Sequence, residues 1–305
     1  MKKALVVGSE GNIGKPLVTY LTKLGWEVIE ADIKPGWQSS YYVADINHPI
    51  DLLPAFDSKP DVVFLLSAMV SRVTCEQASS LAISTNLSGI NNVIQLCKRT
   101  SSKLVFFSTS EVYGPDCDPM DETNSNPNPN NRYGLSKYLG EKLVEYEVRS
   151  HGLQAVTIRP FMMYDENEDF GDFRSAMIRF ASDLATQRPI QVHKGSARGW
   201  LHVSDATNAI ERAAHLDKYS VINIGHPKVE SMISLAEMIR NNLDASKSLI
   251  TEVDLPTRMT GIKNPTLERQ SNLLKVHPQV DLEQGVKMVC EKVVARIQNG
   301  ELTRS

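Results

Sequence analysis

Tyr133 and Lys137, in the segment YGLSK, have the types and the spacing of a proton-transfer pair. Residues four apart share one face of a helix. An ammonium group beside a phenol lowers the pKa of that phenol, which can then accept the proton of an alcohol while a hydride leaves. Tyr138 and Lys142 have the same spacing, so spacing alone does not choose between the pairs. Position favours Tyr133, which follows an Asn/Pro-rich loop and begins its helix, whereas Tyr138 lies about 140° further around it.

A run of polar side chains follows the apolar segment LVFF. Ser108, Thr109, Ser110 and Glu111 come directly after it. If LVFF is a buried strand, these side chains lie at its carboxyl end, where open α/β sheets bind their ligands. Hydroxyl groups and a carboxylate at that position are candidates for substrate binding and catalysis. A turn capped by the serines is the alternative interpretation.

The segment GSEGNIG (8–14) has the glycine spacing of a phosphate-binding turn, between the apolar run KALVV and a helical pattern that begins at Asn12 or Ile13. Glycines suit a tight turn, a close approach to a pyrophosphate and close contact between helix and strand. The free N–H groups of the helix N-terminus would face the phosphates. The three glycines are Gly8, Gly11 and Gly14.

Asp32 ends the next apolar segment, WEVIEAD, and completes a dinucleotide-binding pattern. A carboxylate there would hydrogen-bond both hydroxyls of an adenosine ribose and repel a 2′-phosphate, which favours NAD over NADP. The alternative is that Asp32 only caps the following turn. Lys34, two residues on, leaves some tolerance of NADP. The predicted cofactor is therefore NAD.

Short apolar runs alternate with helical patterns through the first two hundred residues. Such runs, buried between helices, predict an α/β fold with a doubly wound, Rossmann-type parallel sheet. The predicted strands are Ala4–Val7, Glu27–Ala31, Val62–Leu66, Lys103–Phe107 and Ala155–Ile158. Apolar residues three and four apart predict helices after Ile13, over Leu81–Leu96 and over Tyr133–Val148.

The alternation of apolar runs and helical patterns becomes less regular after Pro160. The sequence predicts a loop over Met162–Arg174, strands at Ile190–His193 and Val221–Ile224, and helices over Ser175–Ala185, Asp205–Leu216 and Ser234–Leu243. We therefore expect an NAD-binding domain over residues 1–160. A smaller α/β substrate-binding region is expected over residues 161–305, with residues 190–225 partly returning to the core.

The composition excludes several classes of protein. Among 305 residues, 33 Lys and Arg oppose 36 Asp and Glu, a net charge of −3 that gives no basic footprint for nucleic acid. The longest mostly apolar stretch, Val62–Val70, is far too short to cross a membrane. Four cysteines show no CxxC spacing, and the histidines form no metal-binding pair. We expect a cytoplasmic protein without a metal site, a membrane partner or a nucleic-acid partner.

Taken together, these motifs resemble an extended short-chain dehydrogenase/reductase, and within that family the group of nucleotide-sugar epimerases, dehydratases and decarboxylases. The resemblance covers essentially the whole chain. It rests on GSEGNIG, Asp32, DVVFLLSA, STSEVYG and YGLSK, and continues through IRPF (158–161), GSARGWLHVSD (195–205), INIG (222–225) and LERQSNLLK (267–275). It implies an enzyme that uses NAD to act on a nucleotide-diphosphate sugar.

The resemblance also implies residue roles. Thr109 would hydrogen-bond the reacting oxygen of the sugar, Tyr133 would be the base, and Lys137 would orient the nicotinamide ribose and lower the pKa of Tyr133. The implied cofactor-binding residues are Gly8, Gly11, Asn12, Ile13, Gly14, Asp32, Asp45, Ile46, Ser67, Ala68, Tyr133, Lys137 and Pro160. The implied substrate-binding residues are Ser110, Met162, Arg198 and Arg269, the two arginines holding the diphosphate.

Glu111 bears on the reaction, because the TSEVYG form resembles that of UDP-glucuronate decarboxylases. A carboxylate there implies oxidation at carbon 4 followed by dehydration or decarboxylation, with Glu111 as a catalytic residue. The alternatives are a 4-epimerase, an NAD(P)H-dependent ketone reductase and a non-catalytic NAD-binding module. Met162 replaces the asparagine usual after the RPF motif, and Asp165-Glu166 replaces Gly-Pro, so the sugar pocket departs from the family pattern. The family also implies a homodimer formed through Leu81–Arg99 and Tyr133–Arg149.

Overall fold

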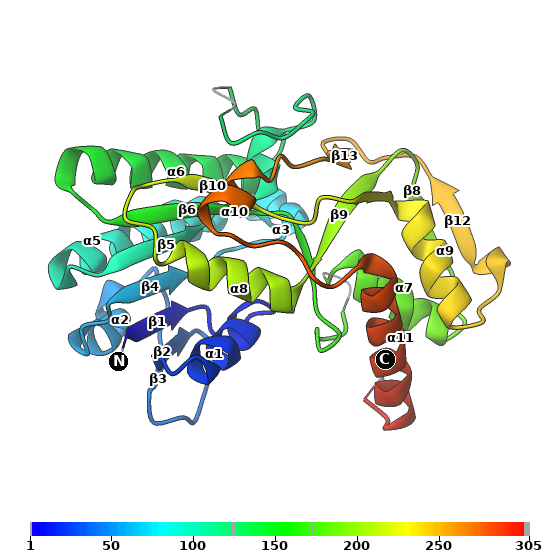
Figure 1. The fold of residues 1–305 in the computed structure, drawn as a ribbon, viewed down its shortest axis with the longest axis horizontal. Helices are drawn as coiled ribbons and strands as arrows, with labels where there is room; N and C mark the ends of the chain where they lie inside the picture. The colour runs from blue at the N-terminus through cyan, green and yellow to red at the C-terminus, as the bar shows by residue number, and fades with distance from the viewer. Residues whose placement is uncertain (1, 124–125, 172–173, 302–305) are drawn as a thin grey trace.

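A parallel sheet forms the centre of the computed structural model, which describes residues 2–123, 126–171 and 174–301. Within this part of the chain the sheet has seven strands in the order β10-β6-β5-β4-β1-β2-β3, and all neighbours are parallel (Figure 1). The strands are β1 (Lys3–Val7), β2 (Glu27–Asp32), β3 (Tyr41–Val43), β4 (Val62–Leu65), β5 (Lys103–Phe107), β6 (Ala155–Pro160) and β10 (Val221–Ile224). The predicted doubly wound α/β fold is confirmed.

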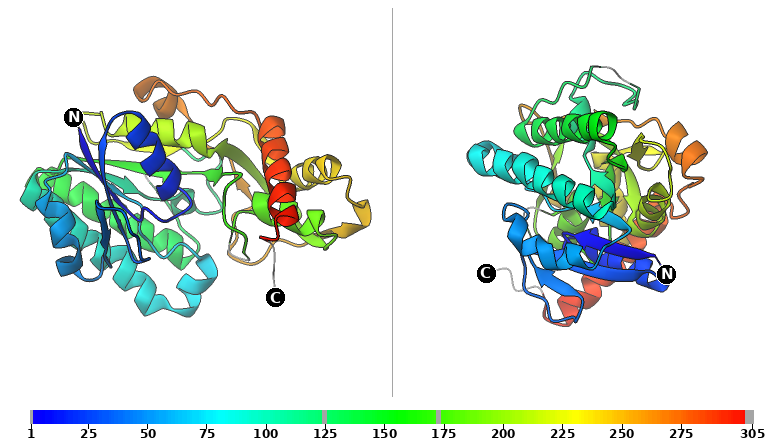
Figure 2. Two further views of the ribbon diagram at one scale, coloured as in Figure 1. Left: turned by 90° about the horizontal axis from the view of Figure 1, so that it is seen from below. Right: turned by 90° about the vertical axis from the view of Figure 1, so that its left-hand side faces the viewer.

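Helices cover both faces of this sheet, as Figure 2 shows in its left view. One face packs on α1 (Gly14–Lys23) and α8 (Val203–Ala213), and the other on α2 (Pro49–Asp57), α5 (Ile90–Thr100) and α6 (Arg132–His151). In β1, Ala4 and Val6 face the first layer, whereas Leu5 and Val7 face the second. Because both faces are buried, the central strands β1, β4 and β5 are nearly continuous apolar runs in the sequence.

The predicted helix over Leu81–Leu96 is confirmed, but a π-helical turn interrupts its regular α-helical hydrogen bonding. The structure has α3 (Arg72–Gln77), α4 (Ser79–Ile83), a π-helical turn at Ser84–Gly89 and then α5. The buried Asn86 side chain lies in this turn, where it accepts a hydrogen bond from Met69 N and donates to Met69 O and Ser136 Oγ. A polar side chain that reaches inward distorts the regular ladder, which apolar spacing does not reveal.

The second half of the chain builds smaller layers beside the first sheet. Figure 1 shows α7, α9 and α11 together at the right, far from α5 and α6. The elements here are β7 (Met162–Tyr164), α7 (Ala176–Ala185), β8 (Ile190–His193), β9 (Ala197–His202), β11 (Val229–Ser231), α9 (Met232–Asn242), β12 (Ile250–Val253), β13 (Ile262–Lys263), α10 (Glu268–Leu273) and α11 (Leu282–Gln298). Short 3-10 turns lie at Ser110–Tyr113 and Lys247–Leu249.

The loop predicted over Met162–Arg174 begins instead with a strand, β7, which pairs in parallel with Trp200–His202 of β9. Tyr164 is buried there against Trp200. The three-residue strand is too short to show alternation in the sequence. In addition, α8 and β10 pack with the first sheet. The domain division at residue 160 stays a prediction.

No helix in the described ranges is long and apolar enough to span a membrane.

Candidate active site

The glycine turn lies between the carboxyl end of β1 and the start of α1. Gly8 has a φ of 95°, which favours glycine, and its N–H donates to the carbonyl of Ala31 at 2.7 Å. A Cβ at Gly14 would collide with the Gly8 carbonyl oxygen, so only glycine permits this approach of helix and turn. The helix begins at Gly14, slightly later than predicted, with Ile13 at its N-cap. Its free N–H groups face the turn, which fits a pyrophosphate.

Asp32 is the last residue of β2, and Asp45 lies two residues beyond the neighbouring strand β3. Asp32 accepts hydrogen bonds from the backbone N–H groups of Glu10 and Lys34, each at 3.0 Å. It therefore ties the glycine turn to its own turn, so the capping alternative describes part of what it does. Asp45 accepts bonds from the backbone and side chain of Asn47 at 2.9 and 2.8 Å.

The other predicted cofactor residues extend this edge. Ser67 and Ala68 follow β4, and a Cβ on Gly8 would lie 2.8 Å from Ser67 N. Ile46 is buried and packs against Gly89, and Pro160 ends β6. The structure thus gathers these residues along one edge of the sheet, where the backbone approaches closely at Gly8 and Gly14. The set fits a bound dinucleotide.

Tyr133 and Lys137 lie in the first two turns of α6, whose N-cap Asn131 accepts a hydrogen bond from Gly134 N at 2.9 Å. Lys137 is buried, 1% exposed, with its ammonium 4.6 Å from the centre of the Phe106 ring. Burial lowers the pKa of Lys137 to about 7, and the nearby charge of Glu141 opposes this. The lysine therefore titrates close to neutral pH.

The expected lowering of the Tyr133 pKa is wrong for this structure. Burial raises the pKa of Tyr133, a hydrogen bond with Thr109 opposes the rise, and the charges of Glu111 and Cys75 add to it. The physical reason is that burial destabilises the phenolate form of Tyr133 by more than the neighbouring groups stabilise it. Thr109 lies beyond the end of β5 in extended conformation and accepts a hydrogen bond from Glu111 N at 3.2 Å.

The competing pair lies elsewhere. Tyr138 packs beside Tyr113 and Phe161, and Lys142 is exposed, 5.4 Å above the Tyr138 ring. Lys142 forms its ion pair with Glu145 at 3.0 Å. Tyr138 and Lys142 thus occupy a packing position, and Thr109 contacts Tyr133 instead.

Glu111 lies at the centre of a buried charged cluster. It pairs with Lys263 Nζ at 2.5 Å and accepts a hydrogen bond from Asn131 Nδ2 at 2.9 Å. Lys263 also donates to Ser110 Oγ at 3.2 Å. Burial would raise the pKa of Glu111, but the positive charges of Lys263 and Arg72 lower it to about 2. Glu111 is therefore a firmly ionised carboxylate at neutral pH.

Lys263 was not predicted from the sequence. It comes from β13, which pairs with β9 and places Lys263 beside Arg198. In the sequence it is a single lysine before Asn-Pro, with nothing to distinguish it from a surface residue. Only the pairing of two short, distant strands brings it to Glu111. Burial lowers the pKa of Lys263, and Glu111 opposes this.

The two predicted diphosphate-binding arginines are not brought together. Arg198 is buried near Glu111 and donates to the carbonyl oxygens of Ala197, Thr260 and Gly261. Burial lowers the pKa of Arg198 to about 10, and Glu111 opposes this. Arg269, on α10, donates to Val221 O at 2.8 Å, at the amino end of β10 and so away from the carboxyl ends that hold the cofactor residues.

Other positive groups approach from the helical side of the site. Glu76 pairs with Arg132, next to Tyr133, at 3.1 Å and with Arg258 at 3.5 Å. Arg258 is exposed, so its contact with Glu76 is a surface ion pair. Met162, at the start of β7, packs against the apolar cluster of α7, α9 and α11. A thioether suits that position better than the family's asparagine.

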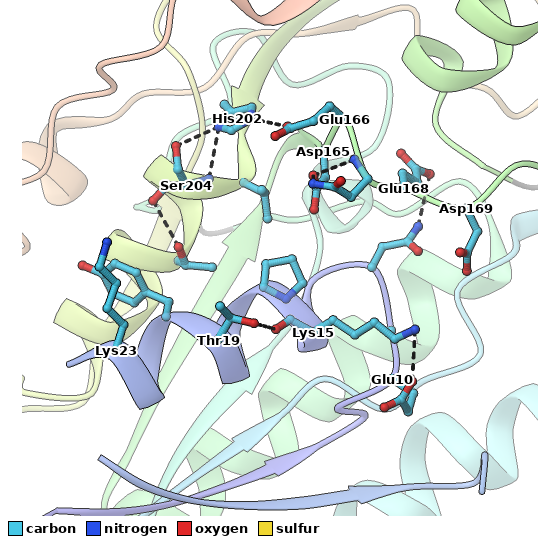
Figure 3. A pocket seen from close by; sticks show the side chains of 17 residues that line it. Glu10, Lys15, Thr19, Lys23, Asp165, Glu166, Glu168, Asp169, His202 and Ser204 are labelled. Atoms are coloured by element: carbon cyan, nitrogen blue, oxygen red, sulfur yellow. Dashed lines mark hydrogen bonds and ion pairs between the residues drawn. The ribbon is translucent and has the colours of Figure 1, made fainter. Parts of the chain in front are cut away.

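A cavity of about 450 Å³ lies beside the glycine turn, between α1, the start of α8 and the acidic segment 165–169 (Figure 3). Glu168 reaches the turn and accepts a hydrogen bond from Asn12 Nδ2 at 3.1 Å. Glu166 pairs with His202 at 2.9 Å, and this hydrogen bond is the main cause that lowers the pKa of Glu166 to about 2. The acidic segment 165–169 thus reaches the glycine turn through Glu168, whereas Asp165 and Glu166, which replace Gly-Pro, bind Asn167 and His202.

Comparison with known proteins agrees with this geometry. The chain is 28% identical to the UDP-N-acetyl-alpha-D-glucosaminuronate decarboxylase of Bacillus cytotoxicus, over 94% of this chain and 96% of that one. It is 27% identical to UDP-glucuronic acid decarboxylase 5 of Arabidopsis thaliana, over 97% and 90%. Its fold matches the UDP-glucose 4-epimerase of Thermotoga maritima with a TM-score of 0.89, at 22% identity over 97% and 99%.

A family model decides the assignment, because it matches residues 4–225, which hold the glycine turn, Thr109, Tyr133 and Lys137. The predicted family, the enzymatic nature and the NAD cofactor are thereby confirmed. The chain belongs to the NAD dependent epimerase/dehydratase family.

Proposed function

We propose that this enzyme oxidises carbon 4 of a nucleotide-linked uronic acid and then releases the sugar carboxylate as carbon dioxide. The observation that supports this choice is the buried pair of Glu111 and Lys263, 2.5 Å apart. The two relatives named as decarboxylases, which align over nearly the whole chain, point the same way.

The low pKa of Glu111 argues against dehydration. A dehydratase must remove a proton from the carbon beside the new ketone, and a base works best when its pKa lies near the working pH. A carboxylate with a pKa of about 2 is a poor base at neutral pH. Decarboxylation needs no such proton removal, because the leaving carboxylate supplies the electron pair.

The charges around Glu111 suit an additional anion on the substrate. Lys263 and Arg198 are cationic groups whose charges act on each other and on Glu111, and the charge of Arg72 acts on all three. The cluster therefore keeps an excess of positive charge. A diphosphate and a uronate carboxylate would both lower its energy, whereas a neutral hexose would supply only the diphosphate.

The residues divide the reaction as follows. Tyr133 takes the proton of the 4-hydroxyl, and Thr109 holds that oxygen. NAD held along the edge of the sheet would supply the acceptor for the hydride of carbon 4 and, after decarboxylation, its donor. In the 4-keto acid the bond between carbon 5 and the carboxylate breaks, and its electrons move to the carbonyl oxygen, which Tyr133 and Thr109 stabilise. A proton then adds at carbon 5. Ser110 and Arg198 would bind the substrate.

The cofactor would follow the edge of the sheet. The ribose of adenosine would meet Asp32, the adenine Asp45 and Ile46, and the pyrophosphate the turn from Gly8 to Gly14. The nicotinamide half would meet Ser67, Ala68, Pro160 and the Tyr133–Lys137 pair. Because the carboxylate of Asp32 would accept hydrogen bonds from the ribose hydroxyls and repel a 2′-phosphate, the enzyme would prefer NAD over NADP.

The enzyme would act as a homodimer. Leu135, Leu139 and Tyr146 lie on one face of α6 and are exposed, as are Leu81 and Ile83 on α4, which packs beside α6. Spacings of four and seven residues form an apolar stripe that a second copy could cover. Cys75, Cys97 and Cys290 are buried free thiols, which suits the cytoplasm.

The deciding experiment is mass spectrometry of nucleotide sugars after incubation with enzyme and NAD. UDP-glucuronate and UDP-N-acetylglucosaminuronate are expected to lose carbon dioxide, and UDP-glucose is expected to stay intact. Loss of water from a neutral hexose would identify a dehydratase. An unchanged mass with a new 4-epimer on chromatography would identify an epimerase, and either result would overturn the proposal.

A further inference from the structure

A buried ion pair lies directly behind Lys137. Glu141, one turn further along α6, accepts two hydrogen bonds from Arg159 of β6, at 2.9 Å from Nε and 2.7 Å from Nη2. Both side chains are nearly inaccessible, 5% and 4% exposed. The Arg159 guanidinium also lies 4.7 Å from the centre of the Tyr113 ring, and Tyr113 donates to Asn223 Oδ1 at 2.7 Å. The carboxylate is thus held rigidly from the side of the sheet.

Glu141 is the carboxylate whose charge acts on Lys137. On α6 the neighbours of Lys137 are Tyr133 and Glu141, and on β5 it meets the apolar ring of Phe106. The groups from other elements, Glu111 after β5 and Cys75 on α3, act on Tyr133. Residues four apart on a helix are neighbours, so Glu141 is within electrostatic reach of the ammonium. A buried lysine without such a partner loses its proton.

We propose that the Glu141–Arg159 pair positions Lys137 electrostatically: Glu141 keeps the ammonium charged, and Arg159 holds both oxygens of Glu141 so that they do not bind the ammonium directly. This inference rests on the proposed function, which gives Lys137 a role beside Tyr133. A lysine that closed its own ion pair with Glu141 would point away from the reacting groups. Packing alone does not require this arrangement, because apolar residues often replace a buried ion pair without loss of stability.

The charge of Lys137 can be measured directly by NMR of the full chain labelled at the ε carbons of its lysines. The Lys137→Met variant identifies the resonance. In Glu141→Gln, the titration midpoint of Lys137 is expected to fall by about one pH unit, because an opposite charge is lost and Arg159 remains. In Arg159→Met, the midpoint is expected to rise. In the double variant it is expected to lie between those of the two single variants.

A purely structural pair would not move the midpoint in opposite directions. Equal midpoints in all variants, or shifts in one direction only, would overturn the proposal. If circular dichroism shows that Glu141→Gln does not fold, the double variant, which leaves no unpaired buried charge, is compared with Arg159→Met, and its midpoint must be the lower of the two. Arg159→Lys keeps the positive charge and is expected to restore the wild-type midpoint.

The pH profile of kcat/KM supplies a second readout. With a nucleotide sugar that the enzyme accepts, the alkaline limb is expected to follow the Lys137 midpoint from variant to variant. If the midpoints shift as expected and no nucleotide sugar reacts, the proposed function fails and the positioning pair stands. If the enzyme is active and the midpoints do not move, the positioning pair fails and the proposed function stands.

Discussion

Replacing Glu111 by glutamine should change how the stability of the protein depends on pH. The folded structure lowers the pKa of Glu111 from 4.5 to about 2, because Lys263 and Arg72 outweigh burial. At about 1.4 kcal/mol per pKa unit, this shift corresponds to about 3 kcal/mol. A group whose pKa is depressed on folding contributes this stability above its unfolded pKa and loses it as the pH falls through the folded value. The sensitive window is therefore pH 4.5 to 2.

The value of about 3 kcal/mol is the stability lost when acid protonates Glu111. It is not the net contribution of the Glu111–Lys263 pair to the free energy of unfolding. Lys263 has the opposite balance, since burial lowers its pKa more than Glu111 raises it. The cost of burying the ammonium remains at neutral pH. In Glu111→Gln the lysine stays buried without its partner, so that variant should also be less stable than wild type at neutral pH.

The measurement is urea unfolding of both proteins by tryptophan fluorescence, from pH 6 down to the lowest pH at which both still fold. The free energy of unfolding of the wild type, relative to the variant, should stay constant above about pH 5 and then fall by up to about 1.4 kcal/mol per pH unit. Glu122, Asp165 and Glu168 remain in both proteins, so their titration cancels. A difference that is constant across the acid range would show that Glu111 titrates normally, and Glu111 could then serve as the base of a dehydratase.

Three further outcomes test the site and the assembly. Tyr133→Phe should retain the fold and NAD binding but lose activity by a factor on the order of 10² or more in a steady-state assay. The control variant Tyr138→Phe should have wild-type activity. The reverse result would show that Tyr138 and Lys142 are the catalytic pair. Asp32→Ala should narrow the preference for NAD over NADP in calorimetric titration; tighter NADP binding by the wild type would refute the assignment. Leu139→Lys should convert a dimer into a monomer in light scattering at micromolar concentration, and a monomeric wild type would exclude the proposed interface.

The fold could be predicted from the sequence because its determinants are local. The strands β1, β4 and β5 are nearly continuous apolar runs, and the glycine turn can be identified from Gly8 and Gly14, where a side chain would collide with the backbone. The first turns of α6 were likewise predictable, since Asn131 caps a helix that begins within one residue of Tyr133.

The electrostatics of the site could not be predicted in the same way. Lys263 meets Glu111 only because β13 pairs with β9, and neither strand determines the other from its own residues. Arg269 matches a family position by order along the chain, yet α10 turns its guanidinium toward Val221. The Tyr133 pKa depends on burial, which spacing on a helix does not measure.

Asn131 leaves little freedom for substitution at its position. Its Oδ1 accepts from Gly134 N, and its Nδ2 donates to Glu111 at 2.9 Å. Aspartate would cap the helix equally well but would set a second negative charge against Glu111, and serine is too short to serve both partners. The side-chain amide of Asn131 therefore holds both the first turn of α6 and the carboxylate of Glu111. A substitution that moves Glu111 would also disturb the helix start that positions Tyr133. Substitutions that change substrate specificity should therefore occur at residues around Asn131, while Asn131 itself is retained.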